Sequence, residues 1–293
     1  MIDFRIKTFL MLCETGSYTK TAEKLLMTQP AVSQHIRYLE QQYDCKLFIY
    51  QGKTLSITPQ GKLLREYAVT VEADSKRISE RLARSKHKQV NRKFGATLTI
   101  GEFCMPPVTE ALLRGKIPFR LYIENTETLL RMLELGEIDF AFVEGQFPKD
   151  AYSHALFATE PFAAVCAPEN PLAHRDTVTL EDLLSQPLIL REKGSGTREI
   201  FETYLTEHGY QTGTFPYLAQ LGSISLIKQA VIKNYGVTFL YRRAAEKELK
   251  SGSLQILPLI GFPLYREFHF VFLKDSIFAP EYMDFFAFCK ECR

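Results

Sequence analysis

Apolar residues recur at helical spacing through the first part of the chain, and short polar breaks separate the repeats. They predict a first helix of about a dozen residues that ends before Gly16, and a short second helix over residues 18–26. Thr28 is placed as an N-cap for a third helix that continues to residue 42, with Pro30 in its first turn. The inward-facing positions of the second and third helices are Ala22, Leu25, Leu26, Val32, Ile36 and Leu39. Two short helices joined by a tight turn, beside another helix, predict a helix-turn-helix.

A short hairpin and a long helix are expected next. Residues 46–50 and 54–58 predict two strands around a turn that carries Lys53, which forms a wing. Thr58 and Pro59 supply an N-cap and a first-turn proline for a helix with a heptad seam of apolar or small residues. The seam consists of Leu64, Ala68, Val71, Ser75, Ile78 and Leu82. It predicts a helix that pairs two subunits; the alternative is an amphipathic helix that lies on its own domain. Residues 86–93 are interpreted as a polar hinge.

Strands and helices alternate in the rest of the chain, which predicts an α/β architecture with mostly parallel sheets. One strand is expected to begin at Leu98, and others are expected over 119–124, 139–143, 162–167, 187–190, 237–240 and 268–273. Helices are expected over 107–114, 126–136, 179–184, 197–208, 223–234 and 280–290. Glu160-Pro161 and Phe262-Pro263 are candidate points at which the chain crosses between two lobes, with 265–293 returning to the first lobe.

Composition excludes several classes of protein. A length of 293 residues suits two or three domains. Hydrophobic residues make up 46% and charged residues 24%, which excludes wholesale disorder and fibrous structure. No apolar run is long enough for a transmembrane helix, and the first residues lack the pattern of a signal peptide. The six scattered cysteines are therefore expected to be reduced thiols in a cytoplasmic protein.

The near-neutral net charge conceals an uneven distribution. Residues 1–93 hold 17 Lys and Arg against 9 Asp and Glu, a net charge of +8, whereas residues 94–293 carry −6. A basic N-terminal part on an acidic remainder indicates a polyanion-binding module joined to a second unit.

The outer face of the third helix carries groups that can read DNA. Gln29, Ser33 and Arg37 lie four residues apart, and no acidic residue occurs from Gln29 to Leu39. Gln, Ser and Arg side chains hydrogen-bond base edges or phosphates, and a proline offers an apolar edge to a thymine methyl group. The expected DNA contacts are Tyr18, Thr19, Thr28, Gln29, Pro30, Ser33, Gln34, Arg37 and Lys53. His35 is expected to be a surface residue of the helix and not a contact.

Several N-caps follow strands in the acidic part. Gly194-Ser195-Gly196-Thr197, Gly222-Ser223 and Asn125-Thr126 each precede an expected helix, where free amides and hydroxyls bind anions. The alternative for each is a plain helix cap. All three caps follow the carboxyl ends of expected strands, where such sheets bind ligands, and this shared position favours a binding site. Glu102 and Glu144 are also expected at strand ends, so they would bind a ligand's amine or hydroxyl or face away. The expected effector contacts are Glu102, Phe103, Thr126, Glu144, Ser195, Thr197 and Ser223.

Catalytic and metal sites have little support in the sequence. Cys289 and Cys292 form an isolated CxxC pair, and the histidines share no ligand spacing, so no metal or cofactor is expected. No nucleophile, base and acid occur in a catalytic arrangement.

Four motifs carry a resemblance over about sixty residues. GSYTKTAEKL, TQPAVSQHIRYLE, KLF and LSITPQG resemble, in order and spacing, the winged helix-turn-helix of LysR-type transcriptional regulators. Asp44 stands where the family usually has glycine, and Tyr50 stands where it usually has a backbone-contacting arginine, which Lys53 partly replaces. The resemblance implies double-stranded DNA, RNA polymerase and further copies of the chain, as a dimer or tetramer, as partners, and no membrane.

The acidic part resembles the effector domain of the same family. The resemblance rests on LTIGEF, ENTETLLRMLELGEIDFAFVEG, APENPLA, LREKGSGTREIFE and LGSISLIKQAV. It implies a multidomain protein: an all-α winged helix-turn-helix over 1–58, a linker helix and hinge over 59–93, and a two-lobed α/β domain of the type II periplasmic-binding-protein fold over 94–293. Lobe I would hold about 94–161 and 265–293, and lobe II about 162–264. The GSGTR pattern resembles that of the branch of the family that includes regulators of sulfur and carbon assimilation.

The resulting hypothesis is a DNA-binding regulator controlled by a small carboxylate or oxyanion. One alternative is an enzyme on the same two-lobed scaffold with a DNA-binding appendage. Another is a nucleoid-type DNA binder without a ligand.

Overall fold

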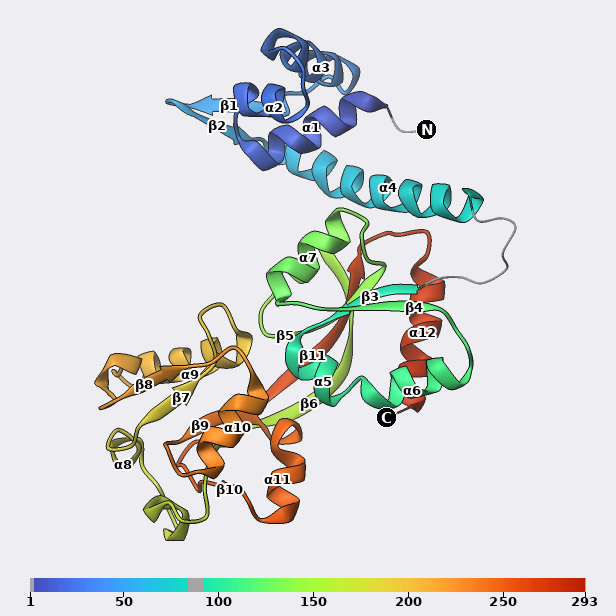
Figure 1. The fold of residues 1–293 in the computed structure, drawn as a ribbon. Coiled ribbons are helices and arrows are strands. Elements are labelled where there is room, and N and C mark those ends of the chain that lie inside the picture. The colour runs from blue at the N-terminus through green and yellow to red at the C-terminus, as the bar shows by residue number, and fades with distance from the viewer. Residues whose placement is uncertain (1–2, 84–91, 293) are drawn as a thin grey trace.

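The computed structural model describes residues 3–83 and 92–292. A helical N-terminal unit with a small hairpin lies beside one long helix, and the remainder of the chain forms a larger α/β unit (Figure 1). Most of the expected hinge, residues 86–91, lies outside the described residues, and Arg92 and Lys93 open the first strand of the α/β unit.

The N-terminal unit contains α1 (Phe4–Thr15), α2 (Tyr18–Lys24) and α3 (Gln29–Gln42). Local caps fix their ends: the Ser17 side chain accepts from an amide of α2, Thr28 accepts from an amide of α3, and Gly16 ends α1 at φ 60°. The prediction that Leu26 faces inward is wrong. Leu26 is 95% exposed at φ 53°, because α2 ends early and its apolar residue sits in the turn.

The wing consists of the antiparallel strands β1 (Phe48–Gln51) and β2 (Thr54–Ile57). Leu47 and Phe48 anchor it in a core that also holds Phe9, Leu12, Ile36 and Leu39. Asp44 has φ 46°, the left-handed region that favours glycine, so this departure from the family pattern carries a conformational cost. Glu40 joins the wing to α3, since its Oε1 accepts from the Leu47 amide at 3.0 Å.

The long helix α4 (Pro59–Ala83) begins at Thr58, whose hydroxyl accepts from the Gly61 amide at 2.9 Å. One face of α4 packs on the α/β unit. Val69 and Ala73 join an apolar cluster with residues of α7 (Thr126–Glu134), and Asp74 is 8% exposed. The Asp74 carboxylate accepts from Ser276 Oγ at 2.7 Å and from the Ile277 amide at 2.9 Å. This docked face was not expected from the sequence.

The predicted seam of α4 is divided between two environments. Leu64 packs on the N-terminal core, and Ala68, only 2% exposed, belongs to that core. Val71, Ser75, Ile78 and Leu82 line a groove of about 870 Å³, in which Ile78 and Leu82 are 40% and 70% exposed. The seam is therefore partly covered within the chain and partly open.

The α/β unit holds nine of the strands among the described residues. They are β3 (Arg92–Ala96), β4 (Phe119–Ile123), β5 (Phe140–Glu144), β6 (Tyr152–Cys166), β7 (Leu188–Leu190), β8 (Leu218–Gln220), β9 (Thr238–Tyr241), β10 (Gln255–Ile256) and β11 (Leu264–Leu273). One sheet runs in the order β10-β6-β11-β5-β3-β4, with β9 also paired to β6, and β7 pairs with β8. The prediction of mostly parallel sheets is wrong: β3 pairs in parallel with β4 and β5, but β6 and β11 pair antiparallel with all their neighbours.

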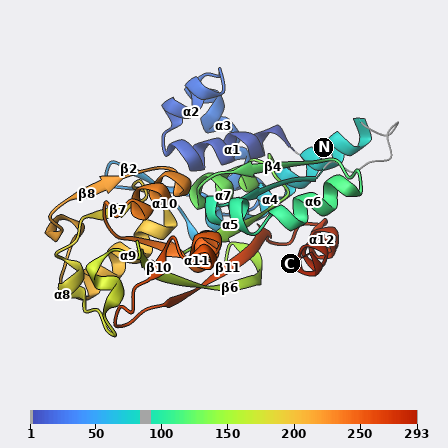
Figure 2. The ribbon, with the colours of Figure 1, turned by 60° about the horizontal axis from the view of Figure 1, so that its bottom comes forward.

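Helices cover this sheet in two lobes, seen apart in Figures 1 and 2. Besides α7 they are α5 (Leu98–Phe103), α6 (Pro106–Arg114), α8 (Leu180–Leu183), α9 (Gly196–Glu207), α10 (Ile224–Ile232), α11 (Glu246–Ser251) and α12 (Ala279–Glu291), with short 3-10 turns at Pro171–His174, Thr212–Thr214 and Arg242–Ala245. The strand expected to begin at Leu98 is wrong, because the strand is β3 and Leu98 begins a helix. A short apolar run with a β-branched residue fits either element, and periodicity does not separate them.

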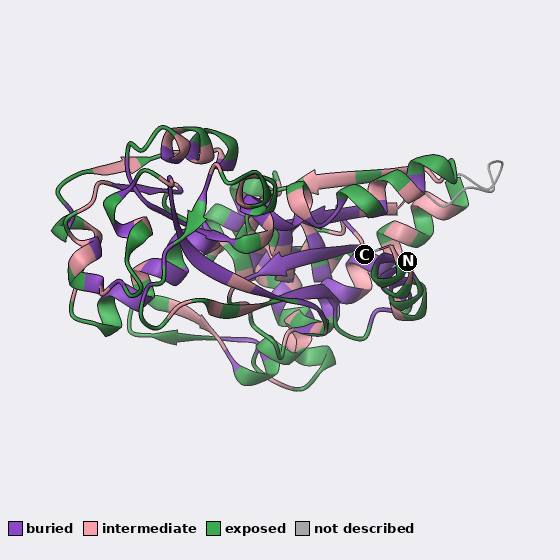
Figure 3. Ribbon diagram, turned by 90° about the horizontal axis from the view of Figure 1, so that it is seen from below, coloured by how far each residue is buried: buried purple, intermediate pink, exposed green. Residues whose placement is uncertain are grey.

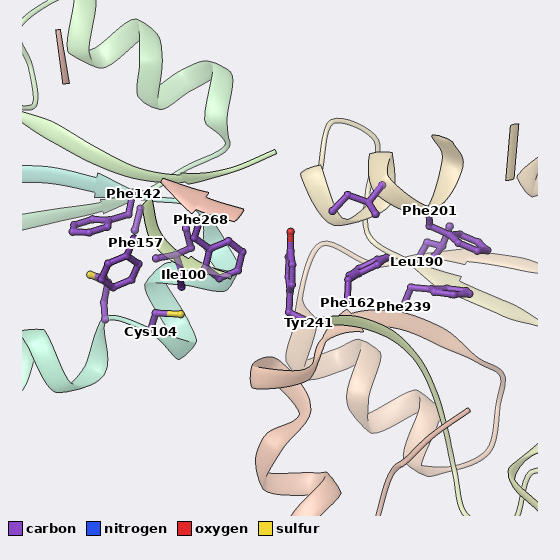
Figure 4. Packing of buried hydrophobic residues seen from close by; sticks show 14 of the residues in the cluster. Ile100, Cys104, Phe142, Phe157, Phe162, Leu190, Phe201, Phe239, Tyr241 and Phe268 are labelled. Atoms are coloured by element: carbon purple, nitrogen blue, oxygen red, sulfur yellow. The ribbon is translucent and has the colours of Figure 1, made fainter. Parts of the chain in front are cut away.

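The strands β6 and β11 pass together from one lobe to the other. They pair from Leu264 opposite Phe162 to Leu273 opposite Tyr152, so Glu160-Pro161 lies inside one continuous strand. Buried strands fill the middle of the molecule and exposed helices surround them (Figure 3). The ring of Tyr241 lies between two groups of buried aromatic side chains (Figure 4), 4.8 Å from Phe268 and 5.4 Å from Phe162 between ring centroids.

Candidate functional site

The exposed face of α3 brings together most of the residues expected to contact DNA. Gln29, Pro30, Gln34 and Arg37 are exposed, and Val32, Ile36 and Leu39 are buried on the opposite face. Gln29 Nε2 donates to Ser33 Oγ at 3.1 Å, which orders the two side chains at the start of the helix. Arg37 forms no ion pair with any described residue, so its five donors are available to a ligand.

The flanking residues lie around this face. Thr28 caps α3, and Tyr18 and Thr19 open α2, with Thr19 exposed and Tyr18 partly buried. Lys53 is exposed at the tip of the wing, after Gly52 at φ 65°. His35 is partly buried, because its Nδ1 lies 2.9 Å from Thr8 Oγ1 and its ring packs edge-on against Phe4. The structure thus separates His35 from the polar face.

A cleft of about 240 Å³ lies between the two lobes of the α/β unit. Residues at the start of three helices border it: Thr126 of α7, Ser195 and Gly196 of α9, and Gly222 just before α10. Three expected contacts, Thr126, Ser195 and Glu144, line the cleft together. Two others adjoin it, since Thr197 Oγ1 lies 2.7 Å from Ser195 Oγ and Ser223 follows Gly222.

The three helix starts differ in how far their amides are already satisfied. The Asn125 side chain accepts from the Thr128 amide at 2.8 Å, and Ser223 Oγ accepts from the Leu226 amide at 3.4 Å. Ser195 makes no such cap hydrogen bond to α9. Because α9 begins without a side-chain cap, its first amides are the best placed of the three to bind an anion.

The buried carboxylate of Glu144 ends β5 at the wall of the cleft. Glu144 is 4% exposed, and burial raises its pKa from 4.5 to about 7. Four polar neighbours oppose this rise in the pKa of Glu144: Tyr241, the Arg191 guanidinium, Thr99 and Thr97. Glu144 Oε1 lies 3.4 Å from Thr99 Oγ1, but Oε2 makes no hydrogen bond with any described residue.

Arg191 is one of the cleft residues that sequence reasoning missed, and Thr97, Glu124 and Glu192 are others. Arg191 is 7% exposed, and its guanidinium donates to both carboxylate oxygens of Glu192 at 2.7 and 2.8 Å. The Arg198 guanidinium donates to the Arg191 carbonyl oxygen at 3.1 Å, which fixes the backbone at Arg191. The signal was its position directly after the buried strand β7, at the carboxyl end where ligands bind in such sheets.

The expected roles of Glu102 and Phe103 in the cleft are not supported by the geometry. Both belong to α5 and not to a strand end, and neither lines the cleft. Glu102 is exposed, whereas Phe103 packs against the second lobe with the Lys228 ammonium 5.2 Å from its ring. The misplacement follows from the strand wrongly expected at Leu98.

Helix α7 connects the cleft with the N-terminal unit. Its first residue, Thr126, lines the cleft and donates to the Glu144 carbonyl at 3.0 Å. Toward its other end, Arg131 pairs with Glu14 of α1 at 2.8 Å and Glu134 pairs with Arg65 of α4 at 3.0 Å. The same short helix therefore touches the interlobe cleft, α1 and α4.

The described residues contain neither a cluster of side chains placed to hold a metal ion nor a helix able to span a membrane. Within residues 3–83 and 92–292, no group of three or more His, Cys, Asp or Glu side chains is placed to hold a metal ion. The six cysteines are free thiols, and burial raises the pKa of Cys289. Across the described residues, none of the helices combines the length and apolar character that crossing a membrane requires.

Two family models match the chain. The one described as a bacterial regulatory helix-turn-helix protein of the lysR family matches residues 5–62, and the one described as the LysR substrate binding domain matches residues 92–292.

Curated relatives align along most of their length. The Escherichia coli HTH-type transcriptional regulator YeiE, named as uncharacterized, is 31% identical over 271 residues, which is 90% of each chain. The HTH-type transcriptional regulator CysL of Bacillus subtilis is 29% identical over 91% of this chain and 89% of its own.

Solved structures share the fold at low identity. Full-length LysG from Corynebacterium glutamicum with bound effector Arg superposes with a TM-score of 0.65 at 15% identity, covering 99% of this chain and 98% of that chain. A full-length OxyR variant from Pseudomonas aeruginosa gives a TM-score of 0.59 at 21% identity, covering 99% of this chain and 95% of that chain.

Proposed function

Because the chain belongs to the LysR family of transcriptional regulators, we propose that α3 and the wing read a specific DNA operator and that a small carboxylate or oxyanion in the cleft changes this binding. The protein is a LysR-type regulator with an effector-binding domain, and members of this family bind DNA and small-molecule effectors and form oligomers. Its relatives are named transcriptional regulators, so it is a regulator and not an enzyme. We divide it into a DNA-binding domain (1–58), a linker helix and hinge (59–93) and an effector domain (94–293).

The observation that carries the DNA-binding proposal is the exposed, acid-free face of α3. Gln29 and Gln34 present amides that match the donor and acceptor pattern of adenine in the major groove. Arg37 and Lys53 carry charge toward the phosphate backbone without an internal ion pair among the described residues. Side chains of both kinds are needed, because phosphate contacts position the helix and base contacts specify the sequence.

The anion proposal rests on the start of α9 and on Arg191. Free amides at a helix start attract negative charge, and the hydroxyls of Ser195 and Thr197 add donors. Arg191 places a buried guanidinium on the cleft wall. A carboxylate or phosphate is the ligand group that such an arrangement stabilises.

Assembly is proposed through the open part of the α4 seam. Val71, Ile78 and Leu82 line the groove beside exposed Leu63 and Tyr67, so a symmetry-related α4 would cover a continuous apolar strip. Association of two such dimers would give the tetramer that the family resemblance implies.

We further propose that α7 transmits ligand binding to the DNA-binding domain. A ligand at Thr126 contacts one end of a rigid helix of 9 residues, and the other end is paired with Glu14 and Arg65. Effector binding changes DNA affinity only if the ligand prefers one arrangement of these domains. Acting on promoters, the protein would meet RNA polymerase there, in the cytoplasm where a prokaryotic chromosome lies.

The experiment for DNA recognition selects operators from a random DNA pool with the full-length protein and measures affinity by fluorescence anisotropy. Gln34→Ala should remove about 1–3 kcal/mol of discrimination at one base pair. Lys53→Ala should weaken binding to every sequence and flatten its salt dependence. Gln42→Ala, at the far end of α3, is the matched control and should leave both unchanged. Wild-type footprints from both the Gln29 and Gln34 variants would exclude α3 as the reader.

A further inference from the structure

The charge of the cleft does not match a ligand that is only an anion. Three carboxylates line it, from Glu124, Glu144 and Glu192, against one guanidinium, from Arg191. Arg191 already pairs with Glu192 through two hydrogen bonds. Arg191 is thus the one cation among the described residues that line the cleft, set against three acidic side chains, so a ligand that brings a donor beside its anionic group suits the cleft better than a bare oxyanion.

Buried polar atoms of three side chains lie on the Glu144 side of the cleft. Glu144 Oε2, Thr97 Oγ1 and the Tyr241 hydroxyl are each buried without a hydrogen bond of ordinary length to a described residue, although both hydroxyls are near enough to act on the Glu144 carboxylate. Their residues are 4%, 3% and 0% exposed. Glu144 and Thr97 both line the cleft, and Tyr241 adjoins Glu144. An unpartnered buried carboxylate oxygen is costly, so Glu144 Oε2 favours a ligand that supplies a donor.

The anion-binding and acceptor sides of the cleft are close together. A side-chain atom added to Gly196, the first residue of α9, would stand 3.6 Å from Glu144 Cγ. A ligand that places one group at the start of α9 can therefore contact Glu144 with a second group that is only one or two covalent bonds away. Since a water molecule occupies about 30 Å³ in the liquid, the cleft volume suits a ligand of roughly ten non-hydrogen atoms or fewer.

Building on the proposed effector site, we propose that the effector is a small acid with a hydroxyl or protonated amine on the carbon next to its anionic group. The acid group binds at the start of α9 and Arg191. The adjacent hydroxyl or amine donates to Glu144 Oε2, which makes Glu144 the residue that selects substituted acids over plain ones.

The test uses calorimetric titration of the full-length protein with matched probes. One set is propionate, lactate and alanine, a second is succinate, malate and aspartate, and isopropylamine is a donor without an acid. In at least one set, the hydroxy or amino acid should bind at least tenfold more tightly than the plain acid. Glu144→Gln, which keeps the shape but removes the charge, should reduce this preference to less than threefold. Glu102→Gln, a carboxylate on α5 outside the cleft, is the matched control and should preserve it.

The outcomes separate this inference from the proposed function. Equal binding of plain and substituted acids, with binding that still depends on Thr197, would overturn the inference and leave the anion proposal standing. Binding of isopropylamine alone, lost in Glu144→Gln, would support Glu144 as the acceptor and overturn the anion proposal. A panel in which nothing binds would overturn both. The preference within each set is measured on the unaltered protein, so the inference is decided even if the variant does not fold.

Discussion

Replacing Glu144 with glutamine should change how the stability of the effector domain depends on pH. The carboxyl is 4% exposed, and burial raises its folded-state pKa from 4.5 to about 7. Below pH 4.5 the group is protonated in both the folded and the unfolded state. Between pH 4.5 and 7 the folded state holds a proton that the unfolded state has released, so the free energy of unfolding falls as pH rises. Above pH 7 the loss is complete.

The size of the effect follows from the width of that pH window. Each pKa unit corresponds to about 1.4 kcal/mol, so the loss between about pH 4.5 and about pH 8.5 should approach about 3 kcal/mol. Glutamine keeps the shape and carries no charge, so Glu144→Gln should match the wild type at about pH 5 and exceed it at about pH 8.5. For a domain of this size, the gain corresponds to a melting temperature higher by about 5–10 °C.

The assay is calorimetric unfolding of the full-length protein from about pH 5 to about pH 8.5. Burial lowers the pKa of His269, which makes stability rise with pH, but this contribution cancels in the comparison of wild type with variant. Glu102→Gln, a carboxylate on α5 outside the cleft, is the control and should follow the wild type throughout. Parallel curves for wild type and Glu144→Gln would show that Arg191 keeps Glu144 ionised in the folded protein, which would refute this reasoning.

Three further predictions concern assembly, ligand binding and domain docking. Val71→Asp places a charge in the α4 groove and should raise the dimer dissociation constant at least about hundredfold in sedimentation, since burying an unpaired charge costs several kcal/mol; an intact dimer would exclude the seam. Thr197→Val removes a hydroxyl 2.7 Å from Ser195 Oγ and should weaken the best-binding acid by about 1–3 kcal/mol in calorimetry, with ligand-free DNA affinity unchanged; equal affinity would leave Thr197 a purely structural cap. Asp74→Ala removes two acceptors from the 276–277 turn and should accelerate exchange of the Ile277 amide by about hundredfold, because hydrogen bonds to a charged group contribute about 1.5–3 kcal/mol each; unchanged exchange would mean that other contacts hold α4 in place.

The helix-turn-helix was predictable because its signals are local. Ser17 and Thr28 cap the helices that follow them, and the buried positions of α3 repeat at helical spacing. The orientation of Leu26 was mispredicted, because the left-handed turn that ends α2 decides where its side chain points.

The rest of the candidate site depends on contacts between distant segments. Asp74 contacts Ser276, and α7 meets α1 through Arg131 and Glu14, which no local pattern specifies. In the cleft, Ser195 and Thr126 were predictable as helix starts, whereas Glu102 was misplaced because an apolar run fits both strand and helix. Arg191 was missed because a charged residue after a strand gives no local sign of being buried.

The paired strands β6 and β11 have a mechanical consequence for the two lobes. They run side by side from Tyr152 to Phe162, with a register shift between Phe268 and His269. A two-stranded ribbon tolerates a wide range of twist, and a bulge adds twist locally. Residues 265–267 and 159–161 pair with each other and with no third described strand, so a change in the angle between the lobes would twist this stretch. Because the cleft has one wall on each lobe, twisting this stretch would open or close the cleft.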